Sequence, residues 1–214
     1  MNRRRRSLLI ATLPAGLMAT RAARAGSYED FFKAVQLDDA DAVRALLQRG
    51  FDPNSRAEDG NVALYLSLRD GAMKVAELLM QAPQVQVDAA NATGETPLMM
   101  AAMRGHLDWL PKLVERGAQV NRDGWTPLHY AATGPEPKAV EWLLARGARI
   151  DARSPNGTTP LMMAARYGNE QSAQLLLQRG ANATLRNQLD LAAADFAKLG
   201  GRDKLAAQLG QVAR

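Results

Sequence analysis

The chain has 214 residues, with 27 Lys and Arg against 22 Asp and Glu, and therefore a formal net charge of +5. A hydrophobic fraction of 47% fits a folded protein and argues against a wholly disordered chain. The absence of cysteine excludes disulfides, thiolate nucleophiles, thiolate-ligated metals and lipid attachment at a cysteine.

The first predicted element is a signal peptide that carries the excess positive charge. Residues 1–25 contain six Arg and no acidic residue, and a mostly apolar stretch of 13 residues runs from Leu8 to Thr20. Ala23-Arg24-Ala25 then supplies a small-x-small cleavage site. This order is typical of a secretory signal, and we predict cleavage near Ala25. The stretch is shorter than the roughly 20 residues of a membrane span, so we expect no stable span after cleavage. An uncleaved anchor or a disordered arm is the alternative.

The export route is indicated by the Arg run. Arg5-Arg6-Ser7-Leu8-Leu9 resembles the twin-arginine export signal, although Arg4 replaces its Ser or Thr and Leu8 replaces its Phe. Positive charge just before the cleavage site, at Arg21 and Arg24, is also similar to such signals. The general secretion pathway is the alternative. Either route implies a periplasmic or secreted protein.

Cleavage would change the charge of the chain. Removing six Arg and no acid takes the net charge from +5 to −1 (5 − 6). No stripe of Lys and Arg remains in the rest of the sequence, so we expect no binding to nucleic acid.

The remainder of the chain is an internal repeat. Three matching runs, each of the form Gly-x-Thr-Pro-Leu-x-x-Ala-Ala, start at Gly94, Gly124 and Gly157, at spacings of 30 and 33 residues. Each is followed by a Leu-rich segment that ends in Arg-Gly-Ala, at 116–118, 146–148 and 179–181. Short repeats at this period predict a stacked solenoid.

These residues resemble the ankyrin repeat, whose signature continues with Gly-His after the first helix, as at Gly105 and His106. The resemblance implies an all-α solenoid of helix-turn-helix units joined by hairpin-like loops. We expect one domain over residues 26–214, with about six repeats of which the terminal ones are degenerate. Their approximate limits are 27–59, 60–91, 92–121, 122–154, 155–187 and 188–214.

The signature residues have physical roles that predict local structure. Thr96, Thr126 and Thr159 each precede a Pro and can cap a helix whose first turn tolerates that Pro. The glycines that come after the first and second helices, such as Gly168, are expected to supply a positive φ. The loop that ends at Gly124 is three residues shorter than its equivalents and predicts a stunted finger. Pro111 predicts either a late start or a kink in its helix.

Catalytic chemistry has little support. No nucleophile elbow, phosphate loop, zinc helix motif or calcium loop is present, and we predict a protein that is not an enzyme and needs no cofactor or metal. His106 and His129 occupy slots in which the family carries His for structural reasons. The Met residues at 99, 100, 103, 162 and 163 are assigned to core packing rather than to soft metal binding, because four of them fall in helix slots that face neighbouring repeats.

Binding to another protein is better supported. In the resembled fold, variable residues of the loops and first helices line a concave surface. Trp125 and Tyr167 belong to the residue types that dominate interface energetics, although both rings could instead lie flat against adjacent repeats. Carried over slot by slot, the predicted binding residues are Asp59, Asn61, Arg69, Asp70, Glu95, Met103, Arg104, Trp125, Arg166 and Tyr167.

The sequence therefore predicts an exported, monomeric module that binds or scaffolds an unknown client protein through its concave face and loop fingers. A secreted effector or toxin-neutralising binding protein that acts outside the cell is the alternative. A hydrolase with an unrecognised site is less well supported.

Overall fold

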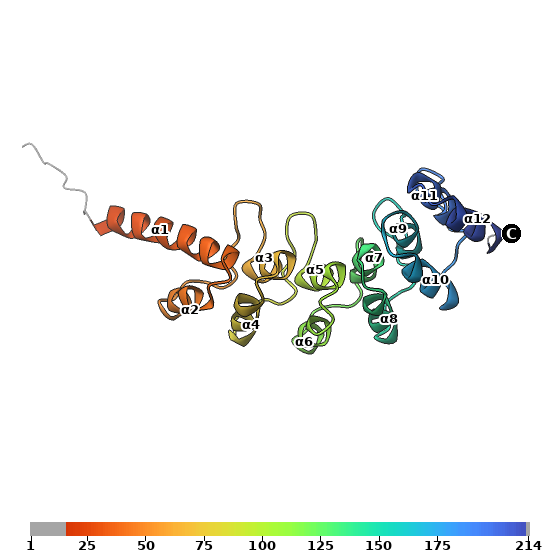
Figure 1. Ribbon diagram of the computed structural model, residues 1–214. Coiled ribbons are helices and arrows are strands. Elements are labelled where there is room, and N and C mark those ends of the chain that lie inside the picture. Colours follow the sequence, from red (N-terminus) through yellow and green to blue (C-terminus); the bar gives the residue numbers. More distant parts are fainter. Residues whose placement is uncertain (1–15, 213–214) are drawn as a thin grey trace, which may run out of the picture.

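A computed structural model describes residues 16–212, with side chains from residue 26 onward. These residues form twelve helices and no named strand (Figure 1). The helices are α1 (Gly16–Gln36), α2 (Ala40–Gln48), α3 (Ala63–Asp70), α4 (Met73–Gln81), α5 (Pro97–Arg104), α6 (Trp109–Glu115), α7 (Pro127–Thr133), α8 (Pro137–Ala145), α9 (Pro160–Tyr167), α10 (Glu170–Gln178), α11 (Ala193–Leu199) and α12 (Asp203–Val212).

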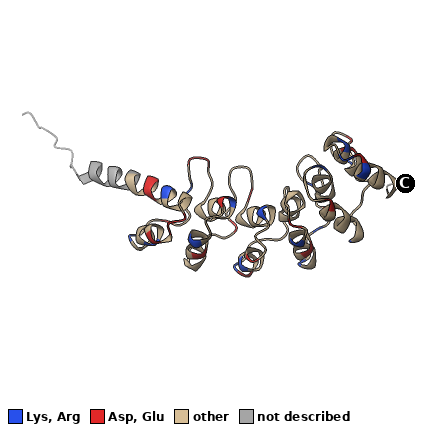
Figure 2. Cartoon of the chain, in the orientation of Figure 1, with Lys and Arg blue, Asp and Glu red and all other residues tan. Residues whose placement is uncertain are grey.

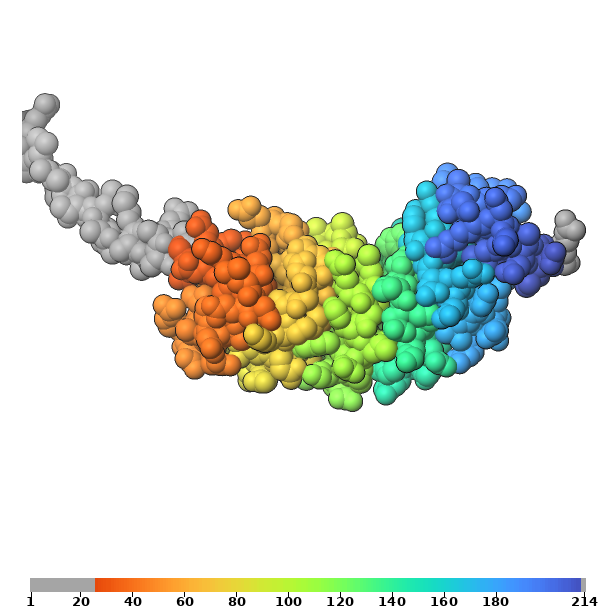
Figure 3. Space-filling model, in the orientation of Figure 1, coloured from red at the N-terminus to blue at the C-terminus, as the bar shows by residue number. Residues whose placement is uncertain are grey.

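The helices form a two-layered solenoid. Each odd-numbered helix contacts the next helix in sequence to make a pair, and it also contacts the odd-numbered helix of the neighbouring pair. The long loops project on the odd-numbered side (Figure 1), and this side of the molecule is hollowed over the green middle of the chain (Figure 3). Buried side chains from all the pairs form a continuous hydrophobic core. The prediction of an all-α solenoid is confirmed.

Helix starts are fixed by the repeated Thr-Pro pair. The side chains of Thr96 and Thr159 accept hydrogen bonds from the backbone N–H groups of Met99 and Met162. The Pro after each Thr takes the first helical position, where its missing N–H costs nothing. Pro111 is the third residue of α6, which begins at Trp109. An N–H group in the first turn has no acceptor within the helix, so the missing N–H of Pro111 breaks no helical hydrogen bond. Pro111 therefore marks a late helix start.

The glycines after the odd-numbered helices are of two kinds, which corrects one expectation. Gly71 and Gly105 have φ values of 82° and 73° and end α3 and α5 in the left-handed conformation, as predicted. Gly168 has a φ of −85° instead. A Cβ atom there would lie 1.8 Å from the carbonyl oxygen of Ala132 in α7. Gly168 is thus needed for close approach between neighbouring helices and not for positive φ.

The loops between pairs form a row of fingers. Most of them close with a backbone hydrogen bond across five residues, such as Asn91 N to Glu95 O at 2.9 Å and Ser154 N to Thr158 O at 2.9 Å. Residues 116–126 between α6 and α7 make a shorter link than residues 146–159 between α8 and α9. No such closing bond is present in the shorter link, all of which the structure describes. The stunted finger brings Trp125 close to the start of α7.

The predicted signal peptide lies partly outside the described residues. Its residues 1–15 are not described, and residues 16–25 belong to the first half of α1. The predicted cleavage point at Ala25 therefore falls within a helix. The buried side chains that the structure describes in α1 begin at Phe31, beyond that point. Cleavage at Ala25 would leave them in place.

Candidate protein-binding surface

The two histidines join neighbouring repeats. His129 is fully buried; its Nδ1 lies 2.9 Å from Thr126 Oγ1, and its Nε2 lies 3.0 Å from the carbonyl oxygen of Thr158. His106 Nε2 lies 3.0 Å from the carbonyl oxygen of Leu68, in the preceding repeat. Burial lowers the pKa of His129 to about 4, although its hydrogen bonds to carbonyl groups act the other way. Both rings thus have the structural role that the sequence predicted for them.

An apolar cavity of about 410 Å³ lies where α5, α7 and α9 meet the stunted finger. We call it the central groove. Its lining residues are Met103, Trp125, His129, Tyr130, Thr133, Met163 and Tyr167. Three of the predicted binding residues, Met103, Trp125 and Tyr167, are therefore brought together in one site.

The aromatic rings of the central groove are packed in a defined geometry. Trp125 is half-buried and contacts His129 and Tyr130 edge to face, at centroid distances of 5.2 and 6.5 Å. Tyr167 is 54% exposed, and Met103 is 37% exposed. Trp125 thus contributes to the wall of the groove as well as to its surface, whereas Tyr167 and Met103 form the open rim.

Glu95 lies beneath the groove and links two neighbouring repeats by hydrogen bonds. Its carboxylate accepts hydrogen bonds from Tyr65 in α3 at 2.9 Å, from Tyr130 in α7 at 2.8 Å and from Asn91 in its own finger at 2.8 Å. Burial alone would raise the pKa of Glu95, but these hydrogen bonds to the charged form outweigh burial and the pKa lies below its usual value. Glu95 therefore acts as a brace between repeats rather than as the free contact residue that the sequence predicted.

Two arginines adjoin lining residues of the central groove in the chain and have no carboxylate partner among the described residues. Arg166 lies with its guanidinium carbon 4.9 Å from the centre of the Tyr167 ring. Arg104 is exposed and comes directly after Met103 at the end of α5. The rim thus combines apolar surface with available positive charge.

The predicted residues nearer the N-terminus form a separate polar cluster. Arg69 pairs with Asp70 at 2.7 Å and with Asp59 at 3.6 Å. Asn61 differs from the expectation, because it is only 6% exposed and its Oδ1 accepts a hydrogen bond from Asn91 at 2.8 Å. Asn61 joins two fingers in this structure and does not offer a contact surface.

The groove also contains residues that the sequence did not single out as binding residues. Tyr130, Thr133 and Met163 lie in α7 and α9 at or near the signature run, where family resemblance assigns residues to packing. Size is the one signal in the sequence that could have identified two of them, since Tyr130 and Met163 are large residues. Of the five Met residues assigned to core packing, Met99, Met100 and Met162 are buried as predicted. Met103 is 37% exposed and Met163 is half-buried, and both line the groove instead.

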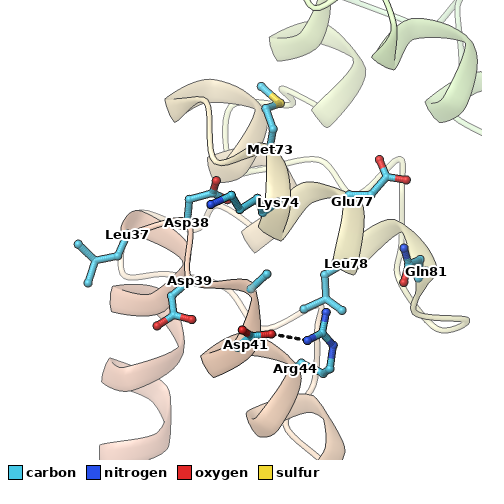
Figure 4. A pocket seen from close by; sticks show the side chains of 11 residues that line it. Leu37, Asp38, Asp39, Asp41, Arg44, Met73, Lys74, Glu77, Leu78 and Gln81 are labelled. Carbon is cyan, nitrogen blue, oxygen red and sulfur yellow. Dashed lines mark hydrogen bonds and ion pairs between the residues drawn. The ribbon is translucent and has the colours of Figure 1, made fainter.

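A second cavity of about 850 Å³ lies on the other layer, between the α1–α2 turn, α2 and α4 (Figure 4). Its lining is largely charged and includes an ion pair between Asp41 and Arg44, which Figure 4 shows as a dashed line. Asp38 accepts a hydrogen bond from the backbone N–H of Val75 at 2.9 Å, and Asp39 caps α2. Two of its acidic groups thus stabilise the helix arrangement.

The described residues show no large patch of one charge, no metal-binding cluster and no membrane span. Lys and Arg are interspersed with Asp and Glu along the described chain (Figure 2). Within residues 16–212, no group of three or more His, Asp or Glu residues is placed to hold a metal ion. None of the described helices is long and apolar enough to cross a membrane.

The family model for ankyrin repeats matches residues 31–123 and 113–187, which is more than half of the chain. The chain belongs to the ankyrin repeat family. The repeated Thr-Pro helix starts, the buried His and the finger loops are therefore ankyrin features, as the resemblance implied.

Named ankyrin relatives share parts of this chain. It is 35% identical over 109 residues to the mouse (Mus musculus) ankyrin repeat and SAM domain-containing protein 6, covering 49% of this chain and 12% of that protein. It is 33% identical over 101 residues to mouse protein phosphatase 1 regulatory subunit 27, covering 45% and 66%. The chain thus spans less than two thirds of the length of either relative.

A solved structure matches most of the ankyrin chain. It belongs to a complex of a predatory endopeptidase from Bdellovibrio bacteriovorus with an immunity protein, and the match has a TM-score of 0.70 at 26% sequence identity. The match covers 85% of this chain and 97% of the other.

Proposed function

We propose that this protein is an exported, non-enzymatic module that binds a client protein through its concave face and fingers. Ankyrin repeats generally mediate contacts between proteins, and the solenoid offers one surface suited to this. The observation that carries the proposal is the central groove, where an exposed Tyr167 and Met103 border an apolar cavity. Large exposed apolar residues around a pocket mark interaction sites more often than scattered single ones.

The chemistry of the groove favours binding over catalysis. Its one ionisable imidazole, that of His129, is buried and has both nitrogens engaged with protein atoms. A general base must reach a proton of the substrate, and this ring has no free nitrogen to do so.

Export is the second part of the proposal, and the Arg-rich N-terminus supports it. Fractionation of cells that express an epitope-tagged chain tests the route. We expect the tagged protein in the periplasm, and the paired replacement Arg5→Lys and Arg6→Lys to retain it in the cytoplasm if the twin-arginine route is used. Retention of the unaltered chain in the cytoplasm would contradict export.

Binding is tested by capture of partners with three tagged chains. Tyr167→Ala removes an exposed ring of the groove rim and leaves the fold intact, because over half of this residue faces solvent. Leu37→Ala is the matched control, since Leu37 is 69% exposed and lines the cavity between α2 and α4. We expect crosslinked partners of the wild type to be lost with Tyr167→Ala and kept with Leu37→Ala. The opposite pattern would assign binding to the other cavity.

Neutralisation of a toxic enzyme is a second candidate function. The solved complex of an endopeptidase with an immunity protein supports it, because one of its chains shares this fold at 26% identity. On this proposal, the client is a hydrolase whose activity the solenoid blocks. Cells that produce the captured client in the periplasm should grow only when the wild-type chain is produced with it. Growth that does not depend on the chain would favour scaffolding instead.

A further inference from the structure

The central groove indicates what kind of segment it receives. We propose that it takes a bulky apolar side chain from an acidic loop of the partner protein. This inference rests on the proposed function and adds the chemistry of the partner to it. The loop would present a Leu, Met or aromatic side chain with Asp or Glu residues beside it.

The floor of the groove favours an apolar side chain of the partner. Its polar atoms are already bonded within the chain: the Tyr130 hydroxyl donates to Glu95 at 2.8 Å, and the Thr133 hydroxyl donates to the carbonyl oxygen of Tyr130 at 2.7 Å. His129 is engaged on both nitrogens. A polar side chain entering the floor would lose its water and find no partner there, which is unfavourable. A cavity of about 410 Å³ lies within the range of natural ligand pockets and accepts a large side chain.

Free groups at the wall and around the rim of the groove favour a partner that offers hydrogen-bond acceptors. The Trp125 Nε1 group and the Tyr167 hydroxyl group have no hydrogen-bond partner among the described residues. The guanidinium groups of Arg104 and Arg166 likewise lack a carboxylate partner in that part of the chain. Indole and guanidinium groups can only donate hydrogen bonds. The free groups around the groove therefore match carboxylate and carbonyl oxygens on an incoming loop.

Four acidic residues of this face interact with other groups instead of these donors. Glu95 accepts hydrogen bonds from two tyrosines, and Asp59 and Asp70 pair with Arg69. Glu136, which lies against Gly105, uses its carboxylate to accept from the backbone N–H of Lys138. Neither Arg104 nor Arg166 forms an ion pair among the described residues, so both are available to a carboxylate of a partner. Opposite charge at an interface raises the rate and specificity of binding.

The test is a selection from a phage-displayed random peptide library on the purified full chain. We expect the enriched peptides to combine a Leu, Met or aromatic residue with neighbouring Asp or Glu. The double variant Arg104→Glu and Arg166→Glu should weaken a synthetic acidic peptide from this set at least about tenfold. It should also shift the selection toward basic peptides. Tyr167→Ala should weaken the same peptide about tenfold or more.

A charge-matched control separates local from general effects. Arg49→Glu with Arg146→Glu changes the net charge equally at the ends of α2 and α8, in the other layer. This control should change the affinity less than about twofold, as expected for distant screened charges. Affinities are measured by fluorescence polarisation of the labelled peptide.

The inference fails if the enriched peptides are basic, lack an apolar residue, or keep their affinity in both groove variants. It also fails if no peptide is enriched. The proposed function is tested separately by the capture experiment. If Tyr167→Ala abolishes capture of the crosslinked partner, the groove binds a protein and only the inferred chemistry of that partner is wrong. Loss of both the peptide result and the capture result would overturn the two together.

Discussion

His129 shows how a polar side chain is kept in the core of this repeat. It is fully buried, and burial lowers its pKa from the ordinary 6.5 to about 4. Between these two pH values, the unfolded chain binds a proton at this residue and the folded chain does not. The free energy of unfolding therefore falls as the pH falls from about 6.5 to about 4.

We expect this residue to account for about 3 kcal/mol of stability lost between pH 7 and pH 4, from a pKa difference worth about 1.4 kcal/mol per unit. His129→Met is the matched variant, because Met99 and Met162 occupy the same slot in the neighbouring repeats. Urea unfolding at a series of pH values measures the effect. A variant whose stability falls as steeply as that of the wild type would show that other groups cause the loss.

Glu95 gives a second prediction at the scale of the residue. In Glu95 the two carboxylate oxygens accept from different tyrosines, one from Tyr65 and the other from Tyr130. Glu95→Gln replaces one of these oxygens by an NH₂ group, which cannot accept a hydrogen bond, so one tyrosine loses its acceptor. We expect a loss of about 1–3 kcal/mol in the free energy of unfolding. The loss should shrink when Tyr130→Phe is present as well, because the two residues share one bond.

Glu141→Gln is the control for the effect of a lost charge. Glu141 pairs with Arg179 at 2.9 Å, and both side chains are roughly half exposed. Its replacement should cost less than about 1 kcal/mol. Equal losses for Glu95→Gln and Glu141→Gln, measured by urea unfolding, would contradict the bracing role of Glu95.

The roles of single residues could be predicted where the repeat itself determines them. The structural role of His129 was evident from its slot, and so was the burial of Met99 and Met162. The burial of Asn61 and the bracing role of Glu95 could not be predicted, because both depend on Asn91 and on tyrosines about 30 residues away. Sequence slots show which face a residue occupies but not which distant partner it meets.

At the scale of the helix, close approach between neighbours depends on Gly168. The Cβ atom of an alanine would lie 1.8 Å from the carbonyl oxygen of Ala132, so α9 would have to move away from α7. We expect Gly168→Ala to reduce the free energy of unfolding by more than about 2 kcal/mol, the scale of overpacking in a rigid core. Thermal unfolding monitored by circular dichroism measures the change.

Gly210→Ala is the matched substitution, because an added Cβ at this position in α12 meets nothing within 4 Å. Stability should stay the same or rise by up to about 1 kcal/mol, since alanine favours helix more than glycine does. Similar losses for both variants would show that the close approach of α9 to α7 is not what requires Gly168.

The helices could be predicted from the sequence better than their terminations. Thr-Pro pairs fixed the starts of α5, α7 and α9, and the short link before Gly124 predicted the stunted finger. The φ of Gly168 could not be predicted, because Gly105 occupies the same slot and is left-handed. At Gly168 the backbone is extended instead, and the side chain of the next residue, Asn169, caps α10.

The architecture of the whole molecule was the most predictable level, because one unit repeated at a nearly constant period can stack in few ways. The central groove was less predictable. It needs the stunted finger, the rim residues of α5 and α9 and the ring of Tyr130 to meet across three repeats. Each part is visible in the sequence, but their meeting depends on the curvature of the array.

A stack in which each helix pair makes its main contacts with the neighbouring pairs should respond differently to a destabilising substitution in the middle and at the end. Leu128 in α7 and Leu205 in α12 are both essentially buried, but α7 has a pair on each side and α12 belongs to the last described pair. Leu128→Ala should lower protection from hydrogen exchange along the whole array. Leu205→Ala should lower it mainly in α11 and α12, because an end unit can open alone.

Native-state hydrogen exchange with mass spectrometry of peptic fragments separates these outcomes. Both substitutions remove the same atoms, each at a cost of about 2–5 kcal/mol, so a difference in the spread of exchange reflects position in the stack. Uniform loss of protection in both variants would mean that the solenoid unfolds as one cooperative unit. In that case, the client would meet either the complete concave face or an unfolded chain, whereas independent opening of the end pair would leave the central groove folded while the C-terminal end opens.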